Sequence, residues 1–226
     1  MKLAIFGGTF DPIHEAHLAV ARRAADRFQL DRVLFVPASH PPHKAGITHA
    51  PYDDRVRMAE LACQGEARFE VSRLEEGVQR SYSINTIEKM QARIAPSDDL
   101  FFIIGADAFA EVRTWRRWED VARRVRFIVV SRPGHLYEAP PEVRLERLDT
   151  IDLPVSSSEI RRSLAAGERP AEVPKPVLEY IFRHGLYGAR VPAESWPADT
   201  APVSGCAARP GRTPFRAPAK PGGNSP

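Results

Sequence analysis

Residues 3–17, LAIFGGTFDPIHEAH, decide the fold of this chain. They begin with four apolar residues, LAIF, a length and composition typical of a buried strand. Gly7 and Gly8 follow and predict the end of that strand, a sharp turn and a close approach of the backbone to a ligand. Pro12 disfavours helical backbone in the residue before it. An amphipathic helix is expected after Glu15, and its apolar positions are Leu18, Ala21, Ala25 and Phe28.

The order strand, glycine turn, helix predicts an anion site. Unpaired backbone N–H groups and the positive end of the helix dipole lie beside such a turn and favour a phosphate. His14 and His17 are three residues apart, so both can face one ligand at the start of the helix. The stretch matches neither G-x-x-x-x-G-K-[ST] nor G-x-G-x-x-G. The residues alone therefore indicate a phosphate or nucleotide site of another kind.

Four further apolar segments predict strands, and patterned segments between them predict helices. The strands are expected at residues 33–36, 69–71, 100–104 and 127–130, and the helices at 53–63, 84–94 and 177–184. This alternation predicts an α/β fold, a Rossmann-like doubly wound parallel sheet of about five to six strands. The most hydrophobic segment, 100–104, is expected at its centre. Residues 135–150 are charged and contain proline, so a peripheral excursion is expected there.

The composition excludes several classes of protein. The formal net charge is +3, but residues 189–226 carry three more basic than acidic residues, so residues 1–188 are formally neutral. A neutral body argues against a nucleic-acid-binding surface. Cys63 and Cys206 belong to no C-x-x-C motif, which argues against a disulfide framework or a zinc site. The sequence shows no secretory signal and no run of roughly 18 apolar residues, so a cytoplasmic protein is expected.

The chain divides into two regions. Residues 1–188 are expected to form one domain, which is long enough to bury a sizeable core. Residues 189–226 hold eight Pro and four Gly with no apolar periodicity. That composition predicts a disordered tail.

Loops after the expected strands carry more candidate residues. Lys44 lies in a PPHK loop, where two prolines stiffen the backbone. Asp107 follows a glycine at the end of the fourth expected strand. Further along, the segment VSSSEIR at 155–161 places three serines before a helical pattern with Glu159 just inside, a typical helix start. Its N–H groups, its hydroxyls and Arg161 can all point at one anion. Each pattern is also compatible with a capped helix or a solvated loop that binds nothing.

Two motifs resemble those of a known family. The segment GGTFDPIHEAH at 7–17 is similar to the signature of bacterial nicotinate-mononucleotide adenylyltransferases, a branch of the nucleotidyltransferase superfamily with the H-x-G-H motif. The serine motif resembles the I-S-S-T-x-I-R of the same family, with Ser158 where Thr is usual. The family's usual glycine between the two histidines is Ala16 here, which narrows the space for a phosphate or for adenine. The resemblance covers residues 1–188.

The resemblance implies a reaction and a set of site residues. AMP would pass from ATP to nicotinate mononucleotide, giving nicotinate adenine dinucleotide and pyrophosphate in NAD biosynthesis. ATP would be bound by Gly7, Gly8, Thr9, Phe10, His14, His17, Gly105, Asp107, Ser156, Ser157, Ser158 and Arg161. The acceptor nucleotide would contact Lys44, Tyr82, Ser83, Asp107, Trp115 and Arg132. Catalytic roles would fall to His14, His17, Lys44 and Arg161.

Further expectations concern the chemistry and the neighbouring residues. The acceptor phosphate is already an anionic nucleophile, so no covalent residue or general base is required. Mg²⁺ is expected to arrive with ATP, held by phosphates and water, with no metal ligands from the protein. Backbone N–H groups at a helix start could hold the ring carboxylate without a dedicated arginine. Ser81 or Ser83 is the expected N-cap of that helix. Trp118 and Met58 are expected to pack, and Arg55 could be a solvated charge.

Three other functions stay open at this point. A sibling enzyme would adenylylate phosphopantetheine or another phosphate, although such sequences are typically shorter and lack the SYS segment and the Trp115 region. A nucleotide-binding regulator would bind without turnover, and Ala16 is the feature that favours it. A nucleic-acid-binding protein would act through the basic tail. The motifs do not give the oligomeric state, and a homo-oligomer is possible.

Overall fold

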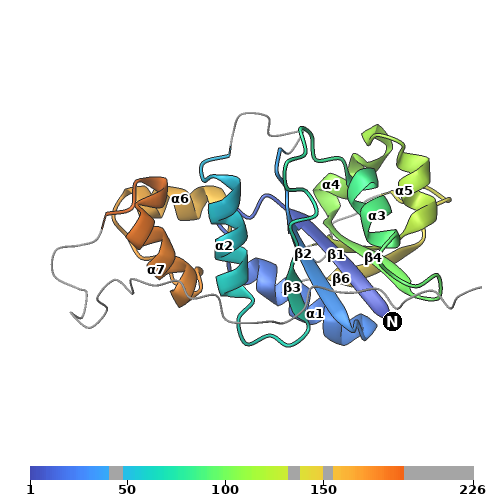
Figure 1. Ribbon diagram of the computed structural model, residues 1–226, viewed down its shortest axis with the longest axis horizontal. Coiled ribbons are helices and arrows are strands. Elements are labelled where there is room, and N and C mark those ends of the chain that lie inside the picture. The colour runs from blue at the N-terminus through green and yellow to red at the C-terminus, as the bar shows by residue number, and fades with distance from the viewer. Residues whose placement is uncertain (41–47, 132–137, 150–154, 191–226) are drawn as a thin grey trace, which may run out of the picture.

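A six-stranded, all-parallel sheet forms the centre of the protein (Figure 1). The computed structural model describes residues 1–40, 48–131, 138–149 and 155–190. The strands lie in the order β3-β2-β1-β4-β5-β6, and their bounds are β1 Lys2–Gly8, β2 Arg32–Pro37, β3 Phe69–Val71, β4 Asp99–Gly105, β5 Arg126–Ser131 and β6 Leu145–Asp149. The α-helices are α1 Glu15–Phe28, α2 Tyr52–Ala62, α3 Ser83–Gln91, α4 Ala106–Ala110, α5 Trp118–Arg124, α6 Ser157–Ala165 and α7 Lys175–His184. Two 3-10 helices are η2 Val112–Thr114 and η3 Leu186–Gly188.

Helices cover both faces of the sheet, as the continuous apolar strands require. On one face, Phe6, Phe35 and Ile103 pack in a core shared with α1 and α2. On the other face, Ile5 and Phe102 pack in a second core with residues of α3, α4 and α5. The predicted doubly wound α/β fold is therefore confirmed, with β1 and β4 side by side at its centre.

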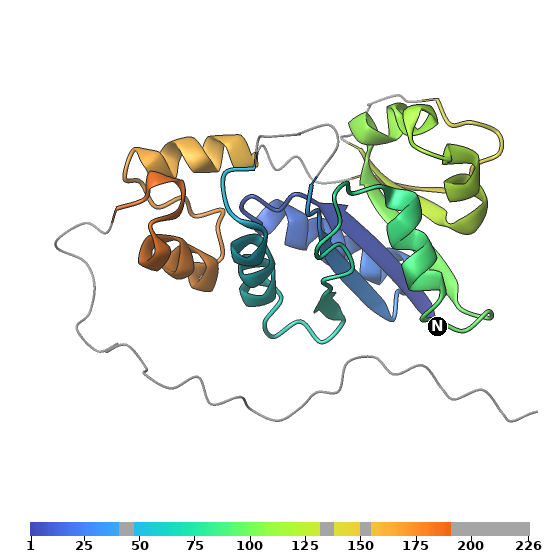
Figure 2. The same cartoon turned by 45° about the horizontal axis from the view of Figure 1, so that its top comes forward.

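The C-terminal helices lie at one end of the molecule. Figures 1 and 2 both show α6 and α7 beyond α2, on the side away from α3, α4 and α5. Val177, Ile181 and Phe182 of α7 belong to the same core as α1 and α2. Gly185 caps the C-terminus of α7, as expected. Its φ of 61° is the left-handed conformation that commonly ends a helix. From residue 191 onwards, the predicted tail lies outside the described residues.

The glycine pair does not end the first strand, contrary to the prediction. Strand β1 continues through Gly8, which pairs with Pro37 of β2. The reason for glycine at position 8 is the ring of Phe10, which turns back over it: a Cβ on Gly8 would lie 2.8 Å from that ring. Phe10 adopts a left-handed φ of 49° and is buried, and its ring lies 5.7 Å from that of Phe6. The turn therefore begins after the glycines and closes on a packed aromatic side chain.

The expectation of a peripheral excursion at residues 135–150 was wrong for its second half. Leu145–Asp149 forms β6, which pairs in parallel with β5 at the edge of the sheet. Leu148 is the buried residue of this strand, and its neighbours are charged. An edge strand needs only one buried face and one partner, so its sequence lacks the long apolar run that identifies the inner strands.

The strand order places a crevice between β1 and β4. Chain connections leave β1 toward β2 on one side, whereas β4 leads to β5 on the other. In an open parallel sheet, ligands bind outside the carboxyl ends of the strands at such a reversal. Within the described residues, no helix is long and apolar enough to cross a membrane.

Candidate active site

A cavity of about 430 Å³ opens at this crevice. Gly7, Gly8 and Thr9 at the end of β1 line it, together with Ile104 and Gly105 at the end of β4. The carboxyl ends of two adjacent parallel strands therefore form its base. A Cβ on Gly7 would make an ordinary contact with the Phe102 ring, at 3.7 Å. The glycine leaves that space to the cavity.

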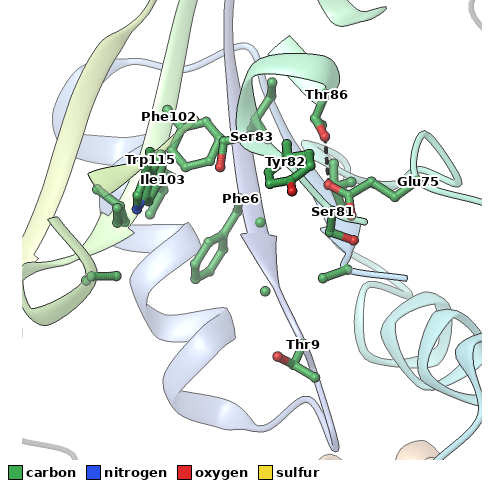
Figure 3. A pocket seen from close by; sticks show the side chains of 18 of the residues that line it. Phe6, Thr9, Glu75, Ser81, Tyr82, Ser83, Thr86, Phe102, Ile103 and Trp115 are labelled. Carbon is green, nitrogen blue, oxygen red and sulfur yellow. Dashed lines mark hydrogen bonds between the residues drawn. The ribbon is translucent and has the colours of Figure 1, made fainter. Parts of the chain in front are cut away.

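Aromatic side chains form the walls of the cavity. Figure 3 shows Trp115 and Phe102 on one side and Tyr82 and Ser83 on the other. Trp115 follows η2 and packs edge-on against Phe102, with ring centroids 6.0 Å apart. Tyr82 is the N-cap residue of α3, so the first N–H groups of that helix lie beside the cavity. A flat ring would find two aromatic neighbours here.

Seven predicted site residues line this cavity. They are Gly7, Gly8, Thr9, Tyr82, Ser83, Gly105 and Trp115. Ser81 also lines it, but neither Ser81 nor Ser83 caps α3 as predicted, because the N-cap is Tyr82 and makes no side-chain capping bond. The Ser81 hydroxyl instead accepts a hydrogen bond from the backbone N–H of His40 at 3.0 Å. Trp118 does not line the cavity, and the guanidinium of Arg113 stacks over its ring.

A buried carboxylate in the cavity wall was not predicted from the sequence. Glu75 is 8% exposed, and its carboxylate accepts a 2.6 Å hydrogen bond from the Thr86 hydroxyl and one from the backbone N–H of Ser39 (Figure 3). The pair joins the loop after β3 to α3 and to the end of β2. Nothing in the local pattern around Glu75 distinguishes it from the exposed Glu76, since its burial depends on three distant segments.

The two predicted histidines lie at the start of α1. His14 is the N-cap residue, and its backbone N–H donates to Nδ1 of His17 at 3.2 Å. The two rings lie 3.8 Å apart with a 34° tilt. His14 is 5% exposed, and its Nδ1 is buried without a hydrogen-bond partner among the described residues. Burial lowers the pKa of His14 to about 4, so its imidazole is neutral at pH 7.

The start of α6 meets the loop that precedes α1. Arg161 donates from Nη1 to the backbone carbonyl of Asp11 at 2.7 Å, and the Ser157 hydroxyl donates to the carbonyl of Pro12 at 3.1 Å. Ser156 caps α6 in a reciprocal capping box with Glu159, as the motif predicts. Two helix N-termini thus converge on residues 11–14, which concentrates N–H groups and positive potential at one place.

The carboxylate of Asp11 fixes this loop from within. It is 3% exposed and accepts hydrogen bonds from the backbone N–H groups of His49 and Ala50, at 2.7 and 3.1 Å. The hydroxyl of Tyr187 in η3 also donates to it at 2.7 Å. Burial and then the Asp11 charge raise the pKa of Tyr187, so its hydroxyl stays protonated and keeps donating.

Arg55 is buried rather than a solvated charge, which corrects that interpretation. It is 1% exposed, and its guanidinium donates to four backbone carbonyls. These carbonyls belong to Thr9, Ala38, Ser39 and Ala50, at 2.7 to 3.4 Å. The side chain therefore links the loops that follow β1 and β2. Met58, one helical turn further along α2, is buried as predicted.

The remaining predicted residues have various placements. The side chain of Phe10 is in the core, so a ligand could meet only its backbone. Asp107 is exposed in the first turn of α4, beside the cavity but not in its lining. Ser158 lies in α6 and accepts from Arg161 at 3.1 Å. Lys44 and Arg132 lie outside the described residues.

The arrangement suits the binding and positioning of a phosphorylated ligand. It offers an apolar, aromatic cavity at one end and, across the loop after β1, two helix N-termini with histidine and arginine side chains. Burial raises the pKa of the Cys63 thiol to about 12, so this residue is not an available thiolate. Charge stabilisation and orientation are therefore the chemistry that these residues can supply.

Comparison with known proteins identifies the family of this chain. Residues 5–163 match the model of the cytidylyltransferase-like family. A probable nicotinate-nucleotide adenylyltransferase from Solibacter usitatus is 72% identical over 187 residues, which cover 83% of this chain and 100% of the relative. One from Thermus thermophilus is 43% identical over 189 residues, with the same coverage.

The fold is shared with solved structures. A Plasmodium falciparum nicotinic acid mononucleotide adenylyltransferase complexed with NaAD superposes with a TM-score of 0.66 over 83% of this chain and 97% of that one. Its sequence identity is 19%, so this likeness bears on the fold. The match to the family model places the chain among the cytidylyltransferase-like nucleotidyltransferases. The identities of 72% and 43% to these two relatives show that the chain belongs to the nicotinate-nucleotide adenylyltransferase family.

Replacing Arg55 by Met should destabilise the protein strongly. The variant leaves four buried carbonyls without their donor and removes one of the cations near the Asp11 carboxylate, so the free energy of unfolding should fall by about 3–5 kcal/mol. Urea denaturation measures this. The matched control is Arg57→Met on the same helix, where an exposed ion pair with Glu60 is lost and a change below about 1 kcal/mol is expected. Equal effects of the two substitutions would contradict the structural role of Arg55.

The burial of His14 should make stability depend on pH. Its pKa is about 4 in the folded protein against 6.5 in the unfolded chain, so the unfolded state binds the proton first as the pH falls. Stability should therefore be complete above pH 6.5 and decrease by about 2–3 kcal/mol toward pH 4 through this group. Denaturation curves for the wild type and His14→Gln across this range measure the difference. Parallel pH profiles for the two proteins would show that His14 is not buried as a neutral ring.

Proposed function

We propose that the protein transfers AMP from ATP to nicotinate mononucleotide and releases nicotinate adenine dinucleotide and pyrophosphate. The observation that carries this proposal is the juxtaposition of an aromatic cavity with a two-helix anion site. The pyridine ring would lie between Tyr82 and Trp115, and the triphosphate would bind at the N-termini of α1 and α6. The family membership supports the same reaction, because the relatives are named for it.

In this reaction an oxygen of the acceptor phosphate attacks the α-phosphorus of ATP. The bond between that phosphorus and the oxygen bridging to the β-phosphate breaks, and pyrophosphate leaves with the electron pair. The nucleophile is already ionised, so no side chain has to remove a proton. His14, His17 and Arg161 would hold the phosphates and stabilise charge that develops on them. Lys44 would add a further positive charge from the loop after β2.

Arg161 is suited to this role because its position is fixed. One guanidinium nitrogen already donates to the Asp11 carbonyl, and another donates to Ser158. These contacts direct the planar fork toward the loop that carries His14. The neutral His14 ring provides one N–H donor, and binding of a polyphosphate beside it would favour uptake of a second proton.

Mg²⁺ would enter with ATP. The described residues bring together no group of three or more His, Cys, Asp or Glu side chains able to hold a metal ion. We expect phosphate oxygens and water molecules as its ligands, because Mg²⁺ prefers a hydrated octahedral shell. The ion would neutralise part of the phosphate charge, and the residues of the protein would orient the phosphates.

The cytoplasm, where ATP is available, is the compartment that we propose for this activity. A possible homo-oligomer stays a prediction, which light scattering would measure. The lack of nucleic-acid binding also stays a prediction, which binding to RNA and DNA at several salt concentrations would measure. These measurements are independent of the assay for the reaction.

Pyrophosphate release from ATP and Mg²⁺ tests the proposed reaction. Three acceptors should be compared side by side: nicotinate mononucleotide, nicotinamide mononucleotide and phosphopantetheine. We expect the first to give the highest kcat/KM, because it alone combines a pyridine ring suited to the aromatic cavity with a ring carboxylate. A preference for phosphopantetheine would instead identify the sibling activity, and ATP binding without release for any acceptor would identify a regulator.

Substituting His17 by Ala tests the anion site. This change should reduce kcat by roughly 10²–10³, the effect expected for one lost donor to a charged transition state. Thermal unfolding of the same variant should show that it folds, because the His17 ring is only partly buried at the first turn of α1. Turnover close to that of the wild type would remove His17 from the catalytic site.

A further inference from the structure

Arg116 stands out among the residues of the cavity. Three charged side chains line it among the described residues, namely Glu75, Glu111 and Arg116, and Arg116 is the cation of the three. It follows Trp115 directly in the chain, but its guanidinium carbon lies 5.0 Å from the ring centroid of Tyr82. Because Tyr82 belongs to the start of α3, the Arg116 side chain links the two aromatic walls.

Arg116 has no ion-pair partner among the described residues. Within the part of the chain that the structure describes, no carboxylate lies within 4.0 Å of its guanidinium. The next residue differs in this respect, since Arg117 pairs with Glu88 and Asp120. The Glu75 carboxylate in the wall is already bound by Thr86 and by the N–H of Ser39. One side-chain hydrogen bond of Arg116 goes to Tyr82. Its charge has no carboxylate partner among the described residues, so the charge and the remaining N–H groups can serve a ligand.

The position of Arg116 is prepared before a ligand binds. Stacking on Tyr82 is a cation–π contact, which restrains a long and otherwise mobile side chain. Arg80 also contacts Tyr82, donating to its hydroxyl at 3.3 Å. These contacts reduce the conformational entropy that Arg116 would lose on binding an anion.

We propose that Arg116 determines acceptor specificity by pairing with the carboxylate on the pyridine ring of the acceptor. This inference rests on the proposed function and goes beyond it by naming the side chain that separates the acid from the amide. A carboxylate that enters a cavity with aromatic walls loses water, and an unpaired charge there is unfavourable. The planar guanidinium restores two parallel hydrogen bonds and the opposite charge. A carboxamide has no charge to offer and gains less from the same contact.

Steady-state kinetics of Arg116→Ala test this role. The ratio of kcat/KM for nicotinate mononucleotide to kcat/KM for nicotinamide mononucleotide should fall by about 10–100-fold, the range of a charge-assisted hydrogen bond. The fall should arise mainly from a higher KM for the acid, while the KM for ATP and the kinetics with the amide change by less than about threefold. Arg116→Lys keeps the charge without the planar fork and should give an intermediate ratio.

Arg113→Ala is the matched control. Arg113 lies in the same segment and also stacks on an aromatic ring, that of Trp118, but it does not line the cavity. Its substitution should leave the ratio unchanged. The proposal is overturned if Arg116→Ala keeps the wild-type ratio, which would leave the carboxylate to the N–H groups at the start of α3. It is also overturned if both acceptors lose activity equally, since Arg116 would then act on the ribose phosphate or on the fold.

Calorimetric titration with each free mononucleotide separates this inference from the proposed function. A wild-type protein that turns over neither acceptor would overturn the proposed function. Arg116 would retain its role if the wild type still bound the acid more tightly than the amide and Arg116→Ala abolished that difference. Equal affinities of the wild type for the two mononucleotides would overturn the role of Arg116 whatever the outcome of the turnover assay.

Discussion

The phosphate side of this molecule depends on the hydrogen bonds that the Arg55 guanidinium donates to backbone carbonyls. The chain leaves the sheet at the ends of β1 and β2, where its carbonyls are no longer paired by strand neighbours. Arg55 donates to the carbonyls of Thr9, Ala38, Ser39 and Ala50 from inside the protein. A lysine has three donors at one point, whereas the arginine fork spreads its donors over several directions. Burial lowers the pKa of Arg55, but the nearby Asp11 carboxylate opposes this effect, so the cation is kept in a region closed to water.

Asp11 extends this arrangement to the C-terminal helices. Its carboxylate binds the backbone just before α2 and the hydroxyl of Tyr187, and its carbonyl accepts from Arg161. Residues about 150 positions apart in the sequence are therefore held on one loop. The same closure removes water from His14 and keeps its ring neutral. The anion site thus combines the permanent cation of Arg161 with a His14 ring that is neutral at pH 7.

The sequence predicted those parts of the structure whose signals are local. The inner strands are uninterrupted apolar runs, and the start of α6 is a capping box with both partners within three residues. Strand β6 was missed because an edge strand with one buried leucine resembles a charged loop. The burial of Arg55 and the contact between Arg116 and Tyr82 were missed for another reason. Each depends on segments that meet only in the folded protein, and an arginine in isolation is most often solvated.

The two ends of the site are built on different elements, and this separation has a consequence for specificity. The phosphates are expected at the loop after β1 and at the starts of α1 and α6. The acceptor ring is expected between the start of α3 and the segment that carries Trp115 and Arg116. Since transfer of AMP needs no protein group to form a bond, catalysis depends on how well the phosphate end is held in place. Residues at the ring end are free to differ in charge and shape without disturbing Arg55 or Asp11. In the proposed reaction, such a fold would keep the chemistry at the phosphate end, while the side chains at positions 82, 115 and 116 would select the acceptor.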